Sequence, residues 1–249
     1  MDLLLEATAR AENDHFWFRG FRRFVAPALD RAAAGRRGLR LLDCGCGTGG
    51  NIRRLLARHG DAFGFDLTMA GLEHARRSGT NRVAQASVAA APFASGTFDI
   101  VTSFDVLYCL PGDVERAAVG EMWRVLKPGG QAVVTVAAMD ILRGDHSVLS
   151  NELRRYSPAS FRALVEAPGF RVERMTYTHA ALFPVVLAVR TAHRLRGLAE
   201  PEAALGEITV PAAPINAVLS GLLAVEAACS RIVPMPFGSS LLCVARKPA

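Results

Sequence analysis

The sequence predicts an α/β protein in which a mostly parallel sheet is covered by helices on both faces. A short apolar run, residues 39–44, breaks abruptly into a glycine-rich turn, and Ile52, Leu55 and Leu56 then follow an amphipathic pattern. This succession is typical of a buried parallel strand that leads into a helix. Further apolar runs of strand length alternate with helical patterns along the chain, as repeated strand-helix-strand units require. The 249 residues fit one domain of this class.

The expected elements follow in a regular order. Strands are predicted at residues 39–44, 61–65, 82–86, 98–103, 131–137, 170–178 and 237–246. Helices are predicted after the glycine turn, at residues 69–77 and 114–126, from Pro158 onward, and at residues 180–195 and 215–232. Capping residues support these boundaries, because Thr68 and Ser157 can cap the helices that follow them and Pro128-Gly129-Gly130 stops the preceding one.

The glycine turn, Gly45 to Gly50, predicts a site for a nucleotide-like ligand. Glycine is needed where the backbone adopts conformations that other residues avoid, or where it approaches a ligand closely. About twenty residues beyond the turn, the next strand ends in Asp66, whose carboxylate can accept hydrogen bonds from both hydroxyls of a ribose. The spacing of Gly45, Gly47 and Gly50 also matches the GxGxxG pattern, so NAD is an alternative ligand at this point.

Asp43 favours a ligand with a cationic end over a dinucleotide. A carboxylate just before the end of the strand would place negative charge near the phosphates of a dinucleotide, whereas it suits a cationic amino acid group. The run Leu42-Asp43-Cys44-Gly45-Cys46-Gly47-Thr48-Gly49 resembles the Leu-Asp-x-Gly-x-Gly-x-Gly motif of the class I S-adenosylmethionine (SAM) dependent methyltransferases. The likeness continues through Asp66, Phe98-Asp99-Ile100-Val101 and Leu126-Lys127-Pro128-Gly129-Gly130. It points to the bacterial, methyltransferase-11-like members that act on small molecules.

The resemblance implies a fold, a cofactor and a set of binding residues. The implied fold is a Rossmann-like sheet of seven strands whose last strand is antiparallel, and the implied cofactor is SAM. The cofactor-binding residues are then Asp43, Gly45, Cys46, Gly47, Gly49, Asp66, Leu67, Ser87, Val88 and Phe104. Asp43 is expected to face the methionine ammonium and Asp66 the ribose. At Ser87-Val88 many relatives carry an acid that binds the adenine amino group, a bond that serine can still accept.

The chain is expected to form a single methyltransferase domain with four regions. Residues 1–34 form an aromatic helical arm, residues 35–137 the SAM-binding core, residues 138–235 a loop, strand and helical region that shapes the substrate site, and residues 236–249 the closing strand. The His15-Phe16-Trp17-Phe18-Arg19 run of the arm either packs on the core or forms a lid that excludes water. The long loop after the fifth strand is expected to be functional.

A general base is needed only if the acceptor of the methyl group carries a proton. Four side chains are candidates for it, in falling order His146, Tyr108, Tyr156 and His15. Each of them can also be a surface or packing residue. The Arg154-Arg155-Tyr156 run resembles the same bacterial group, in which a histidine stands two residues before the run. This chain has Glu152 there, so no histidine role is transferred to that position.

Composition narrows the classes of function. The net charge is +6, but the basic residues are nearly all arginines spread along the chain, so we do not expect a nucleic-acid partner. The five cysteines are scattered and odd in number, and Cys44-Gly45-Cys46 lacks zinc-site spacing, so neither disulfides nor a metal site are expected. The chain shows neither a signal-peptide pattern nor a run of about 18 apolar residues, and we expect a cytoplasmic protein.

The expected function is methyl transfer from SAM to an O, N or C atom of a small, apolar metabolite. An NAD-dependent oxidoreductase and a SAM-fold binding protein without turnover are the alternatives. The apolar helices at residues 180–195 and 215–232 either add cover to the core or form an apolar wall that faces a hydrophobic substrate or a lipid monolayer. Peripheral contact with a membrane is therefore left open, and the sequence does not determine the oligomeric state.

Overall fold

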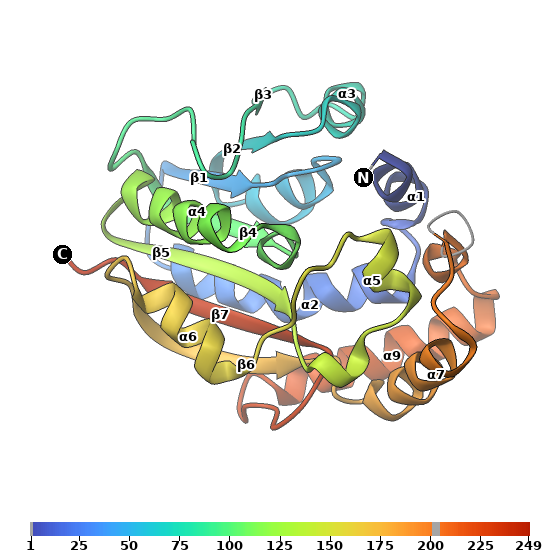
Figure 1. Ribbon diagram of the computed structural model, residues 1–249. Helices are drawn as coiled ribbons and strands as arrows, with labels where there is room; N and C mark the ends of the chain where they lie inside the picture. The colour runs from blue at the N-terminus through green and yellow to red at the C-terminus, as the bar shows by residue number, and fades with distance from the viewer. Residues whose placement is uncertain (1, 201–204) are drawn as a thin grey trace.

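The computed structural model describes residues 2–200 and 205–249 and contains a seven-stranded sheet with the order β3-β2-β1-β4-β5-β7-β6 (Figure 1). The strands are β1 Leu39–Cys44, β2 Gly60–Asp66, β3 Val83–Gln85, β4 Phe98–Phe104, β5 Leu126–Ala137, β6 Arg171–Thr178 and β7 Ser240–Arg246. Pairing is parallel from β3 to β5, and β7 is antiparallel to both of its neighbours. The predicted Rossmann-like sheet with an antiparallel last strand is confirmed.

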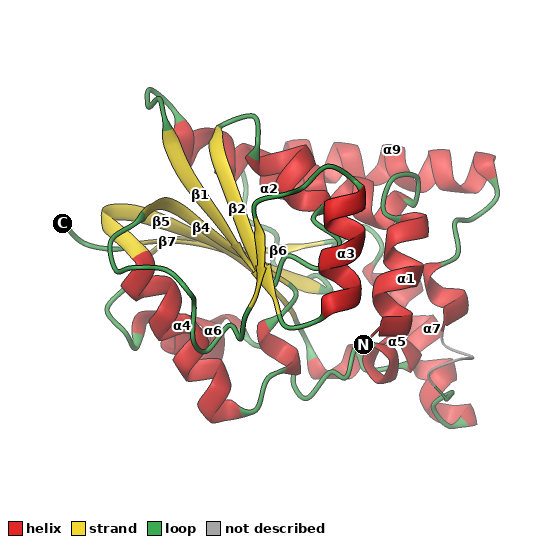
Figure 2. Cartoon of the chain, turned by 90° about the horizontal axis from the view of Figure 1, so that it is seen from above, coloured by secondary structure: helices red, strands yellow, loops and turns green. Residues whose placement is uncertain are grey.

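Helices cover both faces of this sheet. They are α1 Asp2–Ala11, α2 Phe16–Ala33, α3 Met69–Arg77, α4 Gly112–Val125, α5 Asp145–Leu149, α6 Pro158–Glu166, α7 Phe183–Arg196 and α9 Ala213–Cys229. Short turns of helix are η1 Ile52–Leu56, η2 Leu107–Cys109, η3 Asp140–Leu142 and η4 Leu205–Ile208. Figure 2 shows α4 and α6 on one face of the sheet and α2 on the other.

Two apolar clusters form the core, one on each face. On the face covered by α4 and α6, Phe98 and Phe161 are fully buried among strand residues. On the other face, Leu29 of α2 packs against residues of β1 that include Leu41. The aromatic arm therefore packs on the core through α2, which is one of its two expected roles.

Several elements differ from the expected ones. Strand β5 begins at Leu126 rather than at residue 131, because the strand continues through a bulge at Pro128-Gly129-Gly130, where Gly129 has a φ of +76° and the register with β4 shifts between Phe98 and Ile100. Strand β7 begins at Ser240 rather than at residue 237. The segment after the glycine turn is a π-helical turn, Ile52–Leu56. The loop expected after the fifth strand contains η3 and α5.

Of the helices within residues 2–200 and 205–249, none combines the length and apolar composition that crossing a membrane requires.

Candidate functional site

The glycine turn after β1 folds across the end of β2. The amide N–H groups of Gly45 and Cys46 both donate to the Phe65 carbonyl, at 2.9 and 3.0 Å. Gly45 and Gly49 have φ values of +81° and +72°, a region that favours glycine. A Cβ at Gly45 would lie 2.5 Å from Val106 Cγ2, so a side chain is excluded there. Glycine at these positions is what allows the turn to lie flat against the sheet edge.

Asp66 ends β2 beside this turn. One carboxylate oxygen accepts a hydrogen bond from the Gly47 amide at 2.8 Å. The other oxygen accepts from the Thr68 amide at 2.9 Å and also from the Thr68 hydroxyl. The strand-end acid and the glycine turn therefore meet at the carboxyl ends of β1 and β2, which is where ligands bind in open parallel sheets.

Asp43 lies inside the protein behind the turn. Its carboxylate accepts a hydrogen bond from the Thr102 hydroxyl at 2.6 Å. Burial raises the pKa of the Asp43 carboxyl to about 7, the Thr102 hydrogen bond opposes this rise, and the negative charge of Asp66 adds to it. Two nearby carboxylates, one of them desolvated, form an environment that a cationic group stabilises. These donors and acceptors fit the ammonium and ribose of SAM.

Helix α1 covers the glycine turn from outside. A Cβ at Gly47 would lie 3.2 Å from Leu5 Cδ2, so this helix packs directly on the turn. At the end of the helix, the buried carboxylate of Glu12 accepts a hydrogen bond from the Thr48 hydroxyl at 2.7 Å and pairs with Arg53 at 3.4 Å. Figure 1 shows α1 beside α3, at the same end of the sheet as the turn. Helix α1 therefore covers the turn, whereas the expected role of residues 15–19 as a lid that excludes water stays a prediction.

The other expected cofactor residues lie around the same end of the sheet. Leu67, next to Asp66, is exposed. The Ser87 hydroxyl accepts a hydrogen bond from the Ala89 amide at 3.2 Å, and Val88 packs against the core. Phe104 at the end of β4 is buried, with its ring edge-on to Phe21 at 5.2 Å between centroids.

A small polar cavity of about 70 Å³ opens at the carboxyl ends of β4 and β5. Its polar and charged lining includes Asp105, Tyr108, His146, Glu152, Arg155 and Arg190, and its apolar lining includes Trp17 and Val186. Ser239 also lines this cavity, and its hydroxyl is buried without a hydrogen-bond partner within the described residues. We refer to this space as the polar cavity.

Asp105 lines the polar cavity and has an unusual backbone conformation. It follows β4 with a φ of +59°, a conformation that aspartate tolerates better than most residues. Its carboxylate is 3.2 Å from the Thr135 hydroxyl. Burial raises the pKa of the Asp105 carboxyl to about 6, while the Thr135 hydrogen bond and the charge of Arg155 act in the opposite direction.

Glu152 and Arg155 largely neutralise one another. The Arg155 guanidinium makes two hydrogen bonds of 2.8 Å to the two oxygens of the Glu152 carboxylate and donates a third to the Ala138 carbonyl at 3.0 Å. This paired geometry holds the segment after β5 against the strand end. Glu152 is therefore part of an ion pair.

Two of the four base candidates, His146 and Tyr108, line the polar cavity. Burial, together with the charges of Arg190 and Arg155, lowers the pKa of His146 to about 4, so its imidazole is neutral at pH 7. Burial also raises the pKa of the Tyr108 phenol well above its usual value. Both groups are neutral hydrogen-bonding groups at physiological pH.

The other two candidates are placed elsewhere. The Tyr156 hydroxyl donates a hydrogen bond to the Glu115 carboxylate of α4. His15 caps α2, where its Nδ1 accepts from the Trp17 amide at 3.1 Å and its ring stacks on Phe16. Neither side chain is part of the polar cavity lining.

Several polar-cavity residues were not among the expected site residues. Asp105 stands directly after a predicted strand, a signal that parallel-sheet geometry makes meaningful. Arg190 and Ser239 come from segments far apart in the chain, and nothing in the local sequence pairs them with Asp105. Trp17 reaches the polar cavity from the arm and stacks on the buried ring of His179 at 4.1 Å.

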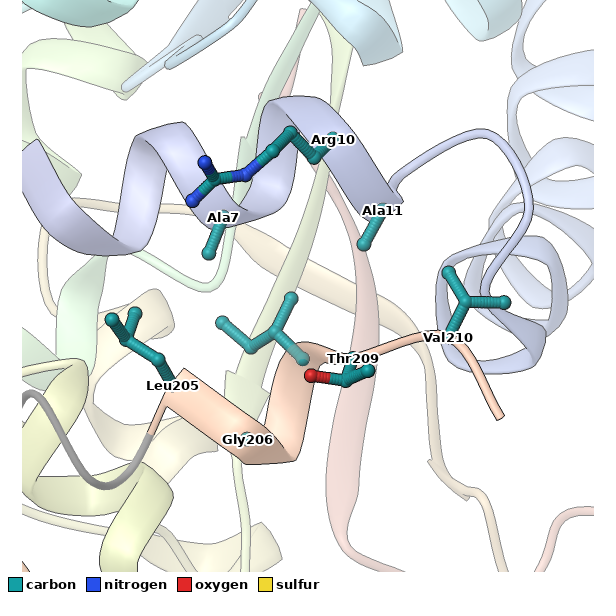
Figure 3. Close-up of a pocket in the computed structure, with 8 residues that line it drawn as sticks. Ala7, Arg10, Ala11, Leu205, Gly206, Thr209 and Val210 are labelled. Atoms are coloured by element: carbon teal, nitrogen blue, oxygen red, sulfur yellow. The ribbon is translucent and has the colours of Figure 1, made fainter. Parts of the chain in front are cut away.

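A larger hollow of about 380 Å³ lies between α1 and the segment that contains η4 (Figure 3). It is lined by Ala7, Arg10 and Ala11 of α1 and by residues 205, 206 and 208–210. None of the expected site residues is part of its lining. This hollow lies beside α1 and shares no lining residue with the polar cavity.

The fold and the glycine-turn site define an α/β protein with a glycine-rich turn and two acids, Asp43 and Asp66, at the carboxyl ends of β1 and β2. A family model described as a methyltransferase domain matches residues 42–134. A malonyl-[acyl-carrier protein] O-methyltransferase of Erwinia pyrifoliae is 31% identical over 189 residues, which are 72% of this chain and 69% of that protein. The chain belongs to the class I SAM-dependent methyltransferases.

Further relatives agree with this family over shorter stretches. A malonyl-[acyl-carrier protein] O-methyltransferase of Enterobacter lignolyticus is 36% identical over 55% of this chain and 54% of that protein. A ubiquinone/menaquinone biosynthesis C-methyltransferase of a Ruegeria species is 37% identical over 46% of this chain and 49% of that protein. The chain spans about half the length of the first curated relatives it matches.

Solved structures show the same fold. The match to a complex between the Haloferax volcanii Trm112 methyltransferase activator and a methyltransferase has a TM-score of 0.60 and 21% identity, and covers 98% of this chain and 95% of that one. A Haemonchus contortus phosphoethanolamine N-methyltransferase 2 matches with a TM-score of 0.61 and 18% identity over 100% of this chain and 58% of that one.

Proposed function

We propose that this protein transfers the methyl group of SAM to a small acceptor whose reacting group lies in the polar cavity. The observation that carries the proposal is the position of Asp105, a half-buried acid just past the carboxyl end of β4 that lines the polar cavity. Ligands of open parallel sheets bind at these strand ends. The family of the chain makes methyl transfer the reaction to test.

The glycine turn and two acids would hold the cofactor. Asp66 would bind the ribose hydroxyls, Asp43 would compensate the methionine ammonium, and the amides of Gly45 to Gly49 would face the carboxylate. SAM supplies a methyl group that its sulfonium already activates. The tasks of the protein are therefore to position the acceptor, to exclude water and to accept a proton where the acceptor carries one.

Asp105 is the group we assign to accept that proton. With a pKa of about 6 it is ionised at pH 7, yet it is desolvated, which makes it a better proton acceptor than a surface carboxylate. Tyr108 and His146, both neutral at that pH, would hydrogen bond to the acceptor and orient it. Asp105 was not among the base candidates taken from the sequence.

The acceptor we favour is a small molecule with an ionisable O–H, N–H or acidic C–H group and an apolar remainder. The charged lining of the polar cavity suits the reacting group, and Trp17 and Val186 suit an apolar part. Relatives named as quinone C-methyltransferases agree with this class. Relatives named as malonyl-[acyl-carrier protein] O-methyltransferases support a second candidate, O-methylation of a carboxylate, for which Arg190 would supply positive charge beside the Glu152–Arg155 pair.

The test is methyl transfer itself. The protein is incubated with SAM labelled on its methyl group and with a fractionated lysate of its own host, and labelled products are separated. Incorporation that depends on the protein and that S-adenosylhomocysteine inhibits is the expected result. Binding of S-adenosylhomocysteine with no labelled product would overturn the proposal in favour of a SAM-fold binding protein.

A further inference from the structure

Helix α9 carries apolar residues on its outward side as well as on its inward side. Leu223 and Ala227 are buried in an apolar cluster, and the polar residues Asn216 and Glu226 are buried beside them. Its outward residues are apolar, with Val218 and Val225 exposed to 70% and 64%, and Ile215 also exposed. Soluble helices normally turn their apolar stripe toward the core and their polar side toward water.

The inward orientation is set by hydrogen bonds. The Asn216 side chain accepts from the Phe16 amide and donates to the Asp14 carbonyl, both at 2.8 Å. The Glu226 carboxylate accepts from the amides of Ala180 and Ala181, at 2.8 and 2.9 Å. These buried partners fix the rotation of α9 about its axis, because turning the apolar stripe inward would leave them unpaired. The exposure of the stripe is therefore a stable property of the fold.

The exposed surface continues past the end of the helix. We define the α9 apolar face as Ile215, Val218, Leu222, Val225, Ile232 and Val233, all of which are exposed. Within residues 212–237, all of which the structure describes, Arg231 is the one exposed charged residue. Figure 1 places α9 at the edge of the molecule, away from α3 and the glycine turn. A contiguous apolar surface of this kind marks an interaction site.

Charge favours a lipid surface over a second copy of the chain. In a symmetric dimer the α9 apolar face would meet itself, and each copy would bring its net charge of +6 toward the other with no acid on the face to compensate it. Negatively charged lipid head groups would complement Arg231 and the net charge of +6. A helix of 17 residues with one apolar side can lie in the plane of a membrane interface without crossing it.

We propose that the α9 apolar face docks on the surface of an anionic lipid membrane. The apolar side chains enter the boundary between head groups and acyl chains, and Arg231 contacts the lipid phosphates. Helix α7 links this surface to the site, because Val185 and Val189 are exposed on it, whereas Val186 and Arg190 line the polar cavity. An acceptor dissolved in the membrane would then reach the polar cavity past α7.

Vesicle binding tests the proposal without cofactor or acceptor, so its outcome is independent of the proposed methyl transfer. The full chain is sedimented with vesicles of phosphatidylcholine containing phosphatidylglycerol, and with pure phosphatidylcholine. We expect binding to the anionic vesicles that high salt weakens. The double variant Val218→Glu, Val225→Glu should lose at least about tenfold in the vesicle-bound to free ratio, because it places charge in the apolar layer.

The control is Leu67→Glu, which adds one carboxylate, half the charge of the double variant, at a similarly exposed position at the other end of the sheet. It should bind vesicles as the parent chain does, and melting curves confirm that both variants are folded. A second measurement needs no substitution. A polarity-sensitive fluorophore on exposed Cys229, at the end of α9, should shift to the blue when anionic vesicles are added.

Three results would overturn the proposal. They are absence of vesicle binding by the parent chain, equal binding by the double variant, and a dimer in solution that Val218→Glu, Val225→Glu converts to a monomer while vesicles have no effect. The last result would assign the α9 apolar face to a second copy of this chain.

Discussion

The Asp66 carboxylate and the Gly47 amide, 2.8 Å apart, join the end of β2 to the glycine turn that follows β1. The two residues are 19 positions apart in the chain. Their contact brings a group that can accept hydrogen bonds from a ribose next to amides that can bind a carboxylate. This contact therefore marks the site at which we expect the cofactor to bind.

The first prediction concerns Asp66. Replacement by Asn keeps the size of the side chain but removes its charge, so its hydrogen bonds to the ribose hydroxyls lose their ionic component. We expect the affinity for SAM, measured by calorimetry, to fall about ten- to a hundredfold. The control is Asp61→Asn, which changes an exposed acid of the same strand that pairs with Arg82. Unchanged affinity of the Asp66 variant would remove the ribose role.

The second prediction concerns the pH dependence of stability at Asp43. Its pKa is about 7 in the folded chain and near 4 when unfolded, so the folded state holds a proton that the unfolded state releases. The stabilisation that the protonated Asp43 carboxyl gives the folded state is fully present below about pH 4 and is lost as the pH rises toward 7. Asp43→Asn should remove this loss, and the variant should be more stable above pH 7 by on the order of 2 kcal/mol.

Urea unfolding at about pH 5 and about pH 8 measures this effect. The Asn variant keeps an acceptor for the Thr102 hydroxyl, so the comparison isolates the charge. The same variant should bind SAM more weakly, because the ammonium loses its compensating carboxylate. Parallel pH profiles for the two proteins would contradict the raised pKa.

The third prediction assigns the acid limb of the pH-rate profile, which is the rise of kcat from acidic to neutral pH, to Asp105. If Asp105 accepts a proton from the acceptor, kcat rises as the pH passes through about 6 and the carboxyl ionises. Asp105→Asn, which also tolerates the positive φ, should lower kcat by about 10²- to 10⁴-fold. A carboxylate acceptor needs no base, so an Asn variant that keeps most of its activity would favour the second candidate function.

The fourth prediction is that His146 is not the group that accepts the proton. Its pKa of about 4 lies below the expected limb, so His146→Gln should change KM or kcat but leave the limb near pH 6 in place. A steady-state pH profile of the variant provides the measurement. Loss of the limb would show instead that His146 is the base, as the sequence first indicated.

The fifth prediction concerns the anchor between α1 and the glycine turn. Glu12→Ala leaves the Thr48 hydroxyl and Arg53 without their buried partner. We expect unfolding stability to fall by about 1–3 kcal/mol and SAM affinity to fall with it, because α1 covers the turn. Glu73→Ala, at an exposed position of α3, should stay within about 0.5 kcal/mol of the parent chain.

The sequence predicted the sheet well, because its strands and the glycine turn follow from local rules, while the cofactor role of the turn stays a prediction. Apolar runs identify the strands, and glycine at Gly45 and Gly49 is required by backbone sterics. The exact start of β5 was missed, because the strand continues through a bulge at Pro128 to Gly130, which are turn formers. The orientation of α9 was also out of reach, since Asn216 and Glu226 find their partners in segments distant in the chain.

What the sequence alone determined is the class of fold, the position of the glycine turn and the acid at the end of the second strand. Each depends on residues close together in the chain. The tertiary structure decided the acceptor end of the site, because the polar cavity joins Trp17, Asp105, Arg190 and Ser239 from four separate segments. It also decided which side of α9 is apolar and exposed. Burial and charge at such places depend on which segments pack together, and short-range sequence patterns do not contain that information.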